Sequence, residues 1–214
     1  MYSDLISYYE DRAKEYEKIY SKAERQSDLL VAAQILQDLF AGKRVFEIAC
    51  GTGYWTEIIA KTAHSIVATD INDAVIEVAK SKIYSPANVN FQIADLFKLE
   101  NTNKYDSLFG GFIWSHILLQ DLNTFIDIAN SLAEKGGTVV FMDNNYVDGS
   151  NLSITGKDSV GNTYQTRTLE NGTTHQILKN FPSEIFIRQL LANKVSDLNF
   201  INLQYYWIMK YRVL

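Results

Sequence analysis

Residues Val45–Trp55, VFEIACGTGYW, decide the fold, because a short apolar run there meets a glycine turn that leads into a helical pattern. Gly51 and Gly53 let the backbone turn tightly, and they let a ligand approach because no Cβ stands in its way. Amide groups at the start of the helix would then face that ligand. We interpret the stretch as a strand, a ligand-binding turn and the first residues of a helix.

The sequence around this stretch alternates between short apolar runs and helical patterns. Such alternation is typical of βαβ units, which build a parallel sheet with helices on both faces. The predicted fold class is therefore α/β, with a Rossmann-like sheet flanked by helices. Strands are expected at 44–49, 65–69, 89–94, 105–113 and 138–143, and helices at 53–62, 72–83 and 118–134.

Segments outside this region predict two helices before it and a hairpin after it. Residues 3–25 form a polar, tyrosine-rich helical pattern, and residues 27–41 form an amphipathic one. Asn171-Gly172 is a strong hairpin turn signal between two strand patterns. We expect one domain over 1–214, with an N-terminal helical cap at 1–41, a ligand-binding core at 42–145, a loop and hairpin insertion at 146–181, and a C-terminal helix and strands at 182–214.

Composition limits the classes of partner and compartment. The 214 residues are 47% hydrophobic and 21% charged, which is ordinary for a soluble globular protein. The net charge of −5 argues against a nucleic-acid binder, which needs a basic surface. No apolar run reaches the length of a membrane span, and the first residues lack the order of a signal peptide. Because Cys50 is the single cysteine, we expect a cytoplasmic protein. We also expect a monomer or weak homodimer, without nucleic-acid or membrane partners.

An acid at the end of the second predicted strand completes a nucleoside-binding pattern. Asp70 would lie beside the glycine turn, where a carboxylate can accept both ribose hydroxyls. A dinucleotide fingerprint would place glycine or alanine at position 56, which is Thr56. Glu47 would repel a pyrophosphate but attract a cation that carries sulfonium and ammonium groups. The charge therefore favours S-adenosylmethionine (SAM) over NAD.

These motifs, E-x-A-C-G-T-G-x-W from Glu47 and Thr69-Asp70, resemble class I SAM-dependent methyltransferases. Three further segments resemble the family: QIADL at 92–96, YD at 105–106 and LAEKGG at 132–137. The resemblance covers about residues 40–145, and it implies a seven-stranded sheet with strands one to five parallel and the last antiparallel. The predicted cofactor-binding residues, for SAM and its product S-adenosylhomocysteine (SAH), are Tyr16, Glu47, Ala49, Gly51, Gly53, Trp55, Asp70, Ile71, Asp95 and Leu96.

Three other segments are similar to one bacterial subgroup of these enzymes, which acts on small molecules or peptides. They are YYEDRAKEY at 8–16, FIWSH at 112–116 and the predicted hairpin at 167–181. The acceptor should lie beyond the carboxyl ends of strands four and five. His116 is expected to act as a base or orienting donor there, unless it only caps a helix. The predicted catalytic residues are His116, Arg167 and Lys179, and the predicted substrate-binding residues are Tyr8, Tyr9, Arg12, Trp114, Tyr146 and His175.

The predicted activity is methyl transfer from SAM to a small molecule or short peptide, with oxygen as the acceptor and carboxylate preferred over hydroxyl. Arg167 and Lys179 could hold an acid, since a guanidinium matches a carboxylate. No metal is expected, because the fourth strand offers no acid to join Asp143-Asn144. N-methylation of a small amine, a non-catalytic SAM-binding regulator and an NAD-type oxidoreductase stay open as alternatives.

Overall fold

The structure is a computed structural model that describes residues 2–13, 15–99 and 104–214, with the backbone alone for 2–6. Its main sheet has seven strands in the order β3-β2-β1-β4-β5-β10-β9. Strands β1 to β5 run parallel, and β10 runs antiparallel to both of its neighbours, as predicted. The strands are β1 Arg44–Ile48, β2 Ser65–Asp70, β3 Asn88–Ile93, β4 Tyr105–Gly111, β5 Ala133–Asn144, β9 Val195–Asn202 and β10 Tyr206–Val213.

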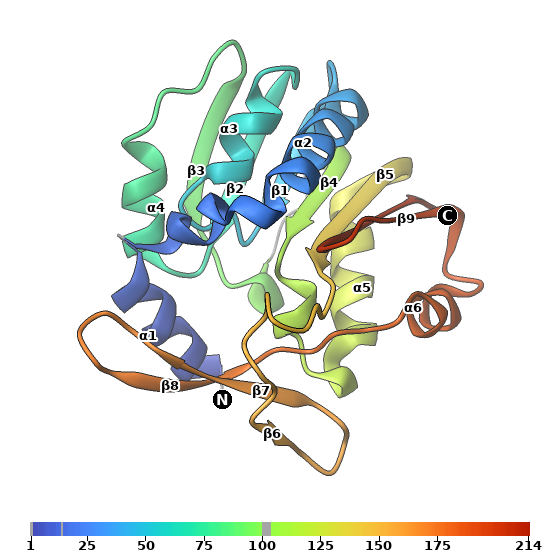
Figure 1. The fold of residues 1–214 in the computed structure, drawn as a ribbon. Coiled ribbons are helices and arrows are strands. Elements are labelled where there is room, and N and C mark those ends of the chain that lie inside the picture. The colour runs from blue at the N-terminus through green and yellow to red at the C-terminus, as the bar shows by residue number, and fades with distance from the viewer. Residues whose placement is uncertain (1, 14, 100–103) are drawn as a thin grey trace.

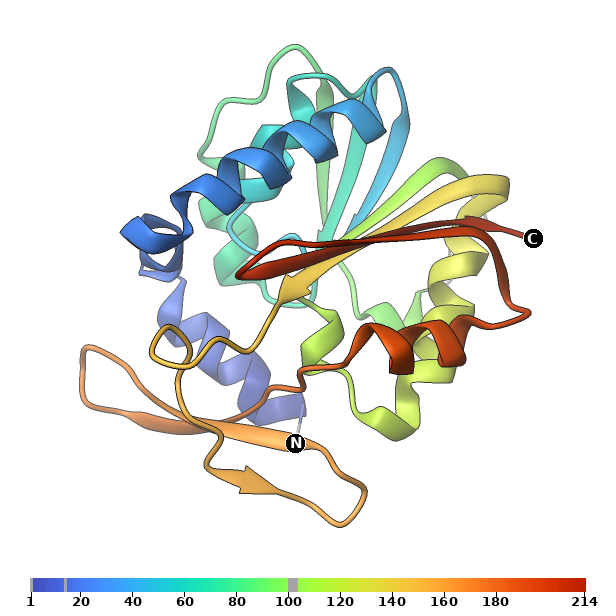
Figure 2. The same cartoon turned by 45° about the vertical axis from the view of Figure 1, so that its right-hand side comes forward.

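Helices cover both faces of this sheet (Figures 1 and 2). Side chains alternate across a strand, so Val45 packs in the cluster under α2 and α3, while Phe46 packs in the cluster under α5 and α6. No helix in the described ranges has the length and apolar character that a membrane crossing requires. The helices are α2 Gln26–Phe40, α3 Tyr54–Ala60, α4 Asp73–Lys80, α5 Leu122–Leu132 and α6 Glu184–Leu191.

The N-terminal segment differs from the single helix predicted at 3–25. It consists of α1 (Tyr2–Arg12) and two 3-10 turns, η1 (Tyr16–Ser21) and η2 (Ala23–Arg25). The break lets α1 rest against the hairpin while η1 packs on the glycine turn. There Tyr20 stacks on Tyr54 with ring centroids 3.8 Å apart and accepts a hydrogen bond from Trp55 Nε1 at 3.2 Å. One straight helix could not make both sets of contacts.

The predicted helix at 118–134 is also shorter than expected. It begins with a 3-10 turn at Leu119–Asp121, and α5 ends at Leu132. Strand β5 starts at Ala133, which pairs with Tyr105 of β4. The register between β4 and β5 then shifts before the next pair of residues, Ser107 and Thr138. Gly136, at φ +75°, belongs to this irregular stretch of the strand rather than to the end of a helix. The strand predicted at 138–143 therefore begins five residues earlier than expected, and the other predicted strands differ from the structure by one or two residues at their ends.

The predicted hairpin is present as part of a separate three-stranded sheet. Its strands are β6 Gly156–Lys157, β7 Thr163–Thr168 and β8 Thr174–Leu178, in that order across the sheet. The two-residue strand β6 lies within the segment that the sequence predicts as a loop. Helix α1 lies along β8 in both views (Figures 1 and 2), and Tyr8 packs with Leu169 and Ile177 between them.

A buried ion pair fixes the hairpin to the main sheet. Lys179, which follows β8, lies 3.0 Å from Asp143 Oδ1 near the end of β5 and donates to Ser115 Oγ at 2.6 Å. Asp143 Oδ2 accepts the Ser115 N–H at 2.9 Å, so both carboxylate oxygens are bonded. Asn180 continues the connection, since its N–H donates to the Ser115 carbonyl at 2.8 Å. The residues after β8 are thus held against the turn that follows β4.

Replacing Lys179 by Met should destabilise the protein by about 3–5 kcal/mol, because Asp143 would stay buried without its cation. The double variant Asp143→Asn/Lys179→Met removes both charges and should recover most of that loss. Denaturant unfolding at pH 7 measures both effects. A single variant within 1 kcal/mol of the unchanged protein would show that the pair does not hold the hairpin.

Candidate functional site

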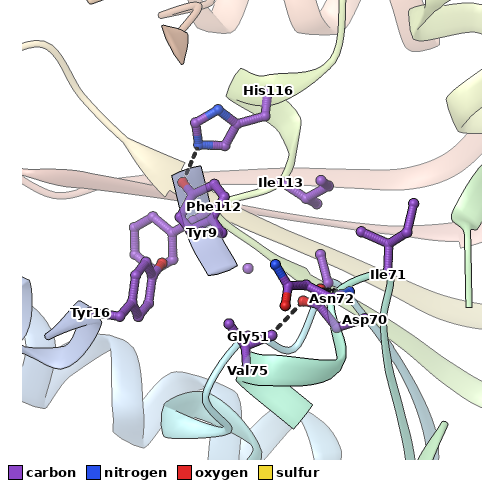
Figure 3. A pocket seen from close by; sticks show the side chains of 12 residues that line it. Tyr9, Tyr16, Gly51, Asp70, Ile71, Asn72, Val75, Phe112, Ile113 and His116 are labelled. Atoms are coloured by element: carbon purple, nitrogen blue, oxygen red, sulfur yellow. Dashed lines mark hydrogen bonds between the residues drawn. The ribbon is translucent and has the colours of Figure 1, made fainter. Parts of the chain in front are cut away.

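An inner cavity of about 110 Å³ lies at the carboxyl ends of β1, β2 and β4 (Figure 3). The structure brings five of the predicted cofactor residues to its wall: Tyr16, Ala49, Gly51, Asp70 and Ile71. The sequence analysis missed further lining residues, namely Asn72, Val75, Gly111, Phe112 and Ile113. The sequence carried a signal for Asn72, because an asparagine just before a helical pattern is a typical N-cap. In the structure it caps α4 by accepting the Ala74 N–H.

The glycine turn has the conformation that its residues suggest. Gly51 and Gly53 have φ of 56° and 78°, in the left-handed region that favours glycine. A Cβ on Gly53 would lie 2.3 Å from Tyr84 Oη, so a side chain there would force a rearrangement. Gly53 therefore shapes the turn without lining the cavity. Trp55 lies behind the turn in a small second pocket together with Glu47.

Asp70 is held firmly at the cavity wall. Its Oδ2 accepts the Gly51 N–H at 2.9 Å and its Oδ1 accepts the Asn72 N–H at 3.0 Å (Figure 3). Burial raises the pKa of this carboxyl, while the backbone hydrogen bonds oppose that effect. These bonds orient the carboxylate between β1 and α4, which suits an acceptor for ligand hydroxyls.

Glu47 is an acid that is buried beside the glycine turn, and one of its carboxylate oxygens lacks a hydrogen-bond partner among the described residues. Its side chain is 2% exposed, and its Oε2 has no hydrogen-bond partner among the described residues. Burial raises the pKa of this carboxyl to about 8. A cationic ligand group beside it would supply the missing charge and favour its ionised form.

Asp95 and Leu96 do not lie at the wall of the inner cavity with the other predicted cofactor residues that line it. Asp95 caps the 3-10 turn Leu96–Lys98 by accepting the Phe97 N–H at 3.0 Å, and it pairs with Lys98 at 3.1 Å. Neither residue lines the inner cavity. Their assignment to the cofactor rests on the motif alone.

An outer cleft of about 650 Å³ adjoins the inner cavity. The two spaces share Tyr9, Tyr16, Phe112 and His116 as lining residues. The N-terminal segment and the hairpin supply most of the cleft, together with the loop after β5. Five cationic side chains line it: Arg12, Lys22, Arg25, Arg167 and Lys179.

His116 has a fixed tautomer at the shared wall. Its Nδ1 lies 2.6 Å from the Leu178 carbonyl, which can only accept, so Nδ1 carries the proton. Its Nε2 is then an acceptor, and the Tyr9 hydroxyl donates to it at 2.9 Å (Figure 3). Burial and then the charges of Lys179 and Arg167 hold the pKa of His116 well below its usual value. The imidazole is therefore neutral and a weak base.

Arg167 projects from β7 toward the aromatic residues of α1. It donates to Gln165 Oε1 at 3.1 Å, and its guanidinium carbon lies 5.5 Å from the centre of the Tyr8 ring. Its Nε is buried and has no hydrogen-bond partner within the described residues. Arg12 approaches the same ring and donates to Tyr8 Oη at 2.7 Å. The structure thus brings Arg12, Arg167 and the predicted tyrosines together.

Three predicted substrate-binding residues lie outside both spaces. Trp114 is 1% exposed, and its ring packs in the core against Phe125, Phe141 and Trp207. Tyr146 packs edge-on against Phe181 at the surface. His175 lies beside Tyr8 and 3.8 Å from Asp11. The turn after β4 directs the Trp114 side chain into the core while His116 lines the cleft, so the substrate role of Trp114 stays a prediction from the sequence.

Replacing Glu47 by Gln should change how stability depends on pH. The folded-state pKa of Glu47 is about 8 and its ordinary value 4.5, so the stability it contributes is full below 4.5 and lost as pH rises through 8. The variant should gain about 1.4 kcal/mol per pH unit over the unchanged protein in that window. Denaturant unfolding at pH 5, 6.5 and 8 measures this, with Glu57→Gln on the exposed side of α3 as control. Parallel curves for the two proteins would contradict it.

Comparison with known proteins agrees with this geometry. The family described as "Methyltransferase domain" matches residues 45–137. Malonyl-[acyl-carrier protein] O-methyltransferase 2 of Ilyobacter polytropus is 35% identical over 101 residues, which are 45% of this chain and 38% of that relative. The chain thus matches well under half the length of that curated relative.

Two solved structures resemble the whole chain. The DhpI–SAM–HEP complex has a TM-score of 0.80 and 25% identity, covering 99% of this chain and 97% of that one. The DhpI–SAH complex has a TM-score of 0.78 and is 23% identical, and the match covers 99% of this chain and 96% of that chain. With the predicted sheet order, the glycine turn and Asp70 all in place, the chain has the fold of the class I SAM-dependent methyltransferases, and its residues 45–137 match the methyltransferase domain family.

Proposed function

We propose that this protein transfers a methyl group from SAM to an oxygen of a small acid, giving SAH and a methyl ester. When bound, SAM supplies an electrophilic methyl group whose bond to sulfur breaks as the acceptor oxygen takes it. An ionised acid has no proton to lose, so the protein needs to position the acceptor and exclude water. The observation that carries the proposal is the neutral His116 among cations at the wall that both spaces share.

The residues of the inner cavity and of the small second pocket beside it fit the cofactor. Asp70 would accept the ribose hydroxyls, because its carboxylate is fixed at the wall by two backbone N–H groups. Glu47 would balance the ammonium group, since its Oε2 is buried and unpartnered among the described residues. Two solved complexes that contain SAM or SAH and share the fold support the same cofactor.

The acceptor should meet the methyl group at the shared wall. A hydroxyl acceptor would need a base there, and His116 is a weak one because burial and neighbouring cations oppose its protonation. An amine would arrive as an ammonium ion and be repelled by Arg167 and Lys179. An acid arrives ionised and is attracted by the same charges. The electrostatics of the cleft therefore favour an acid over an alcohol or an amine.

Arg167 is the residue best suited to hold that acid. Its Nε is buried, unpartnered among the described side chains and charged, so an acceptor oxygen would satisfy it. Lys179 contributes positive charge, but Asp143 and Ser115 already take its hydrogen bonds, so we assign it to positioning the hairpin. The name of the Ilyobacter polytropus relative, an O-methyltransferase, also favours oxygen.

SAM should raise the melting temperature of the protein and NADH should not, since binding stabilises the folded state by mass action. Asp70→Asn should weaken SAM binding by roughly tenfold or more, because a charged acceptor for the ribose is lost. Calorimetric titration measures the affinity, and Asp73→Asn, an exposed acid in the first turn of α4, is the matched control. Equal affinity for the two variants would contradict the role of Asp70.

Labelled methyl from SAM should enter small carboxylic acids faster than alcohols, phenols or amines of the same size. At saturating SAM, where the ionisation of Glu47 no longer limits cofactor binding, the rate should stay level from pH 6 to 8.5, because the acceptor is already ionised and His116 stays neutral. Arg167→Met should lower kcat/KM by roughly 10- to 100-fold, mainly through KM. A rate that rises steadily with pH on an alcohol would point to a hydroxyl acceptor. Tight SAM binding without transfer to any acceptor would favour a regulator instead.

A further inference from the structure

Arg25 is a buried cation in the outer cleft without a matching acid. It lies at the end of η2 and is 6% exposed. Its guanidinium donates to neutral acceptors: Ser150 Oγ at 2.9 and 3.0 Å, the Ser150 carbonyl at 3.2 Å and Asn144 Oδ1 at 3.2 Å. It lies over the rings of Tyr205 and Tyr206. Among the described residues no carboxylate oxygen lies within 4.0 Å of it.

A neighbouring lysine, which is exposed, contacts the same loop. Lys22 donates to the Ser150 carbonyl at 2.6 Å, and its pKa is lowered by burial and then by the charge of Arg25. Glu24 approaches the same place, but it accepts from Ser150 Oγ at 3.0 Å and forms no ion pair with either cation. Burial of charge without a partner costs free energy, which an anionic ligand would offset.

Five cationic residues line the cleft, against two acidic lining residues, Glu15 and Glu170, so the lining carries a net positive charge. Arg167 lies near the shared wall, and Arg25 lies beside the loop after β5. Lys179 lines the same cleft and feels the charges of both, but Asp143 already balances it. A single carboxylate at Arg167 would leave Arg25 and Lys22 with Glu24 as the acid near them, and Glu24 bonds to Ser150 rather than to either cation.

We propose that the acceptor carries a second anionic group, a carboxylate or a phosphate, which Arg25 and Lys22 bind while the first lies beside Arg167 and His116. This inference rests on the proposed methylation of a small acid. Arg25 comes from η2 and Arg167 comes from β7, and both line the outer cleft, so together they would select acids by the spacing of their two anionic groups. One group is methylated, and the other orients the molecule.

The test compares labelled methyl transfer from SAM to three probe acids by the full chain. Butyrate has one carboxylate, glutarate adds a second at the far end, and 4-phosphooxybutyrate adds a phosphate instead. We expect a KM for glutarate or 4-phosphooxybutyrate at least tenfold below that of butyrate. Which of the two is preferred identifies the second group. Equal KM values for all three acids would overturn the inference.

Variants separate this role from a purely structural one. Arg25→Gln should reduce the preference for the doubly charged acids to near unity, Lys22→Gln should reduce it partly, and Arg25→Lys should retain part of it. Arg188→Gln, which removes an exposed guanidinium on α6, should keep the full preference. Melting temperature and SAM affinity confirm that each variant is folded. A folded Arg25→Gln or Lys22→Gln variant with the full preference would overturn the inference.

The outcomes also separate the inference from the proposed function. Transfer to butyrate as fast as to the doubly charged acids leaves the methylation of acids intact and removes only the second subsite. Transfer to alcohols or amines, with none to any of the three acids, overturns both. Calorimetric titration of glutarate into the SAH-bound protein gives a second readout, and binding there should weaken at least tenfold in Arg25→Gln.

Discussion

The buried ion pair between Lys179 and Asp143 is the interaction on which the site depends. It holds the strand after the hairpin turn against the turn that follows β4. That contact places the Leu178 carbonyl on His116 Nδ1, and so it decides which imidazole nitrogen faces the cavity. It also sets where β7 presents Arg167. The Lys179–Asp143 pair therefore determines how His116 and Arg167 are presented to a ligand.

The positive charge of the outer cleft has two effects that reinforce each other. Lys179 and Arg167 lower the basicity of His116, which makes the site poor at removing protons. The same charges attract an acceptor that has already lost its proton. A strong base and a strong anion site would oppose each other at this short range, since each added cation weakens the base. This combination supports the proposed ionised acceptor.

The parts of the fold that depend on local sequence could be predicted. Alternating apolar runs gave the parallel sheet, and Gly51, Gly53 and Asp70 marked the inner cavity, because glycine conformation and strand ends are local properties. The break between α1 and η1 could not be predicted, because contacts with the distant hairpin and glycine turn cause it. The core position of Trp114 and the pairing of Lys179 with Asp143 likewise depend on how separate segments pack. Helical or strand periodicity is a local pattern, so it does not predict how separate segments pack.

Tyr9 and Tyr16 line both the inner cavity and the outer cleft, and both come from the N-terminal segment. That segment lies over the glycine turn, where Thr52 Oγ1 donates to Glu17 Oε1 at 2.7 Å, and along β8. One segment of the chain thus supplies walls to both spaces. A change in the position of that segment would therefore alter the inner cavity and the outer cleft together.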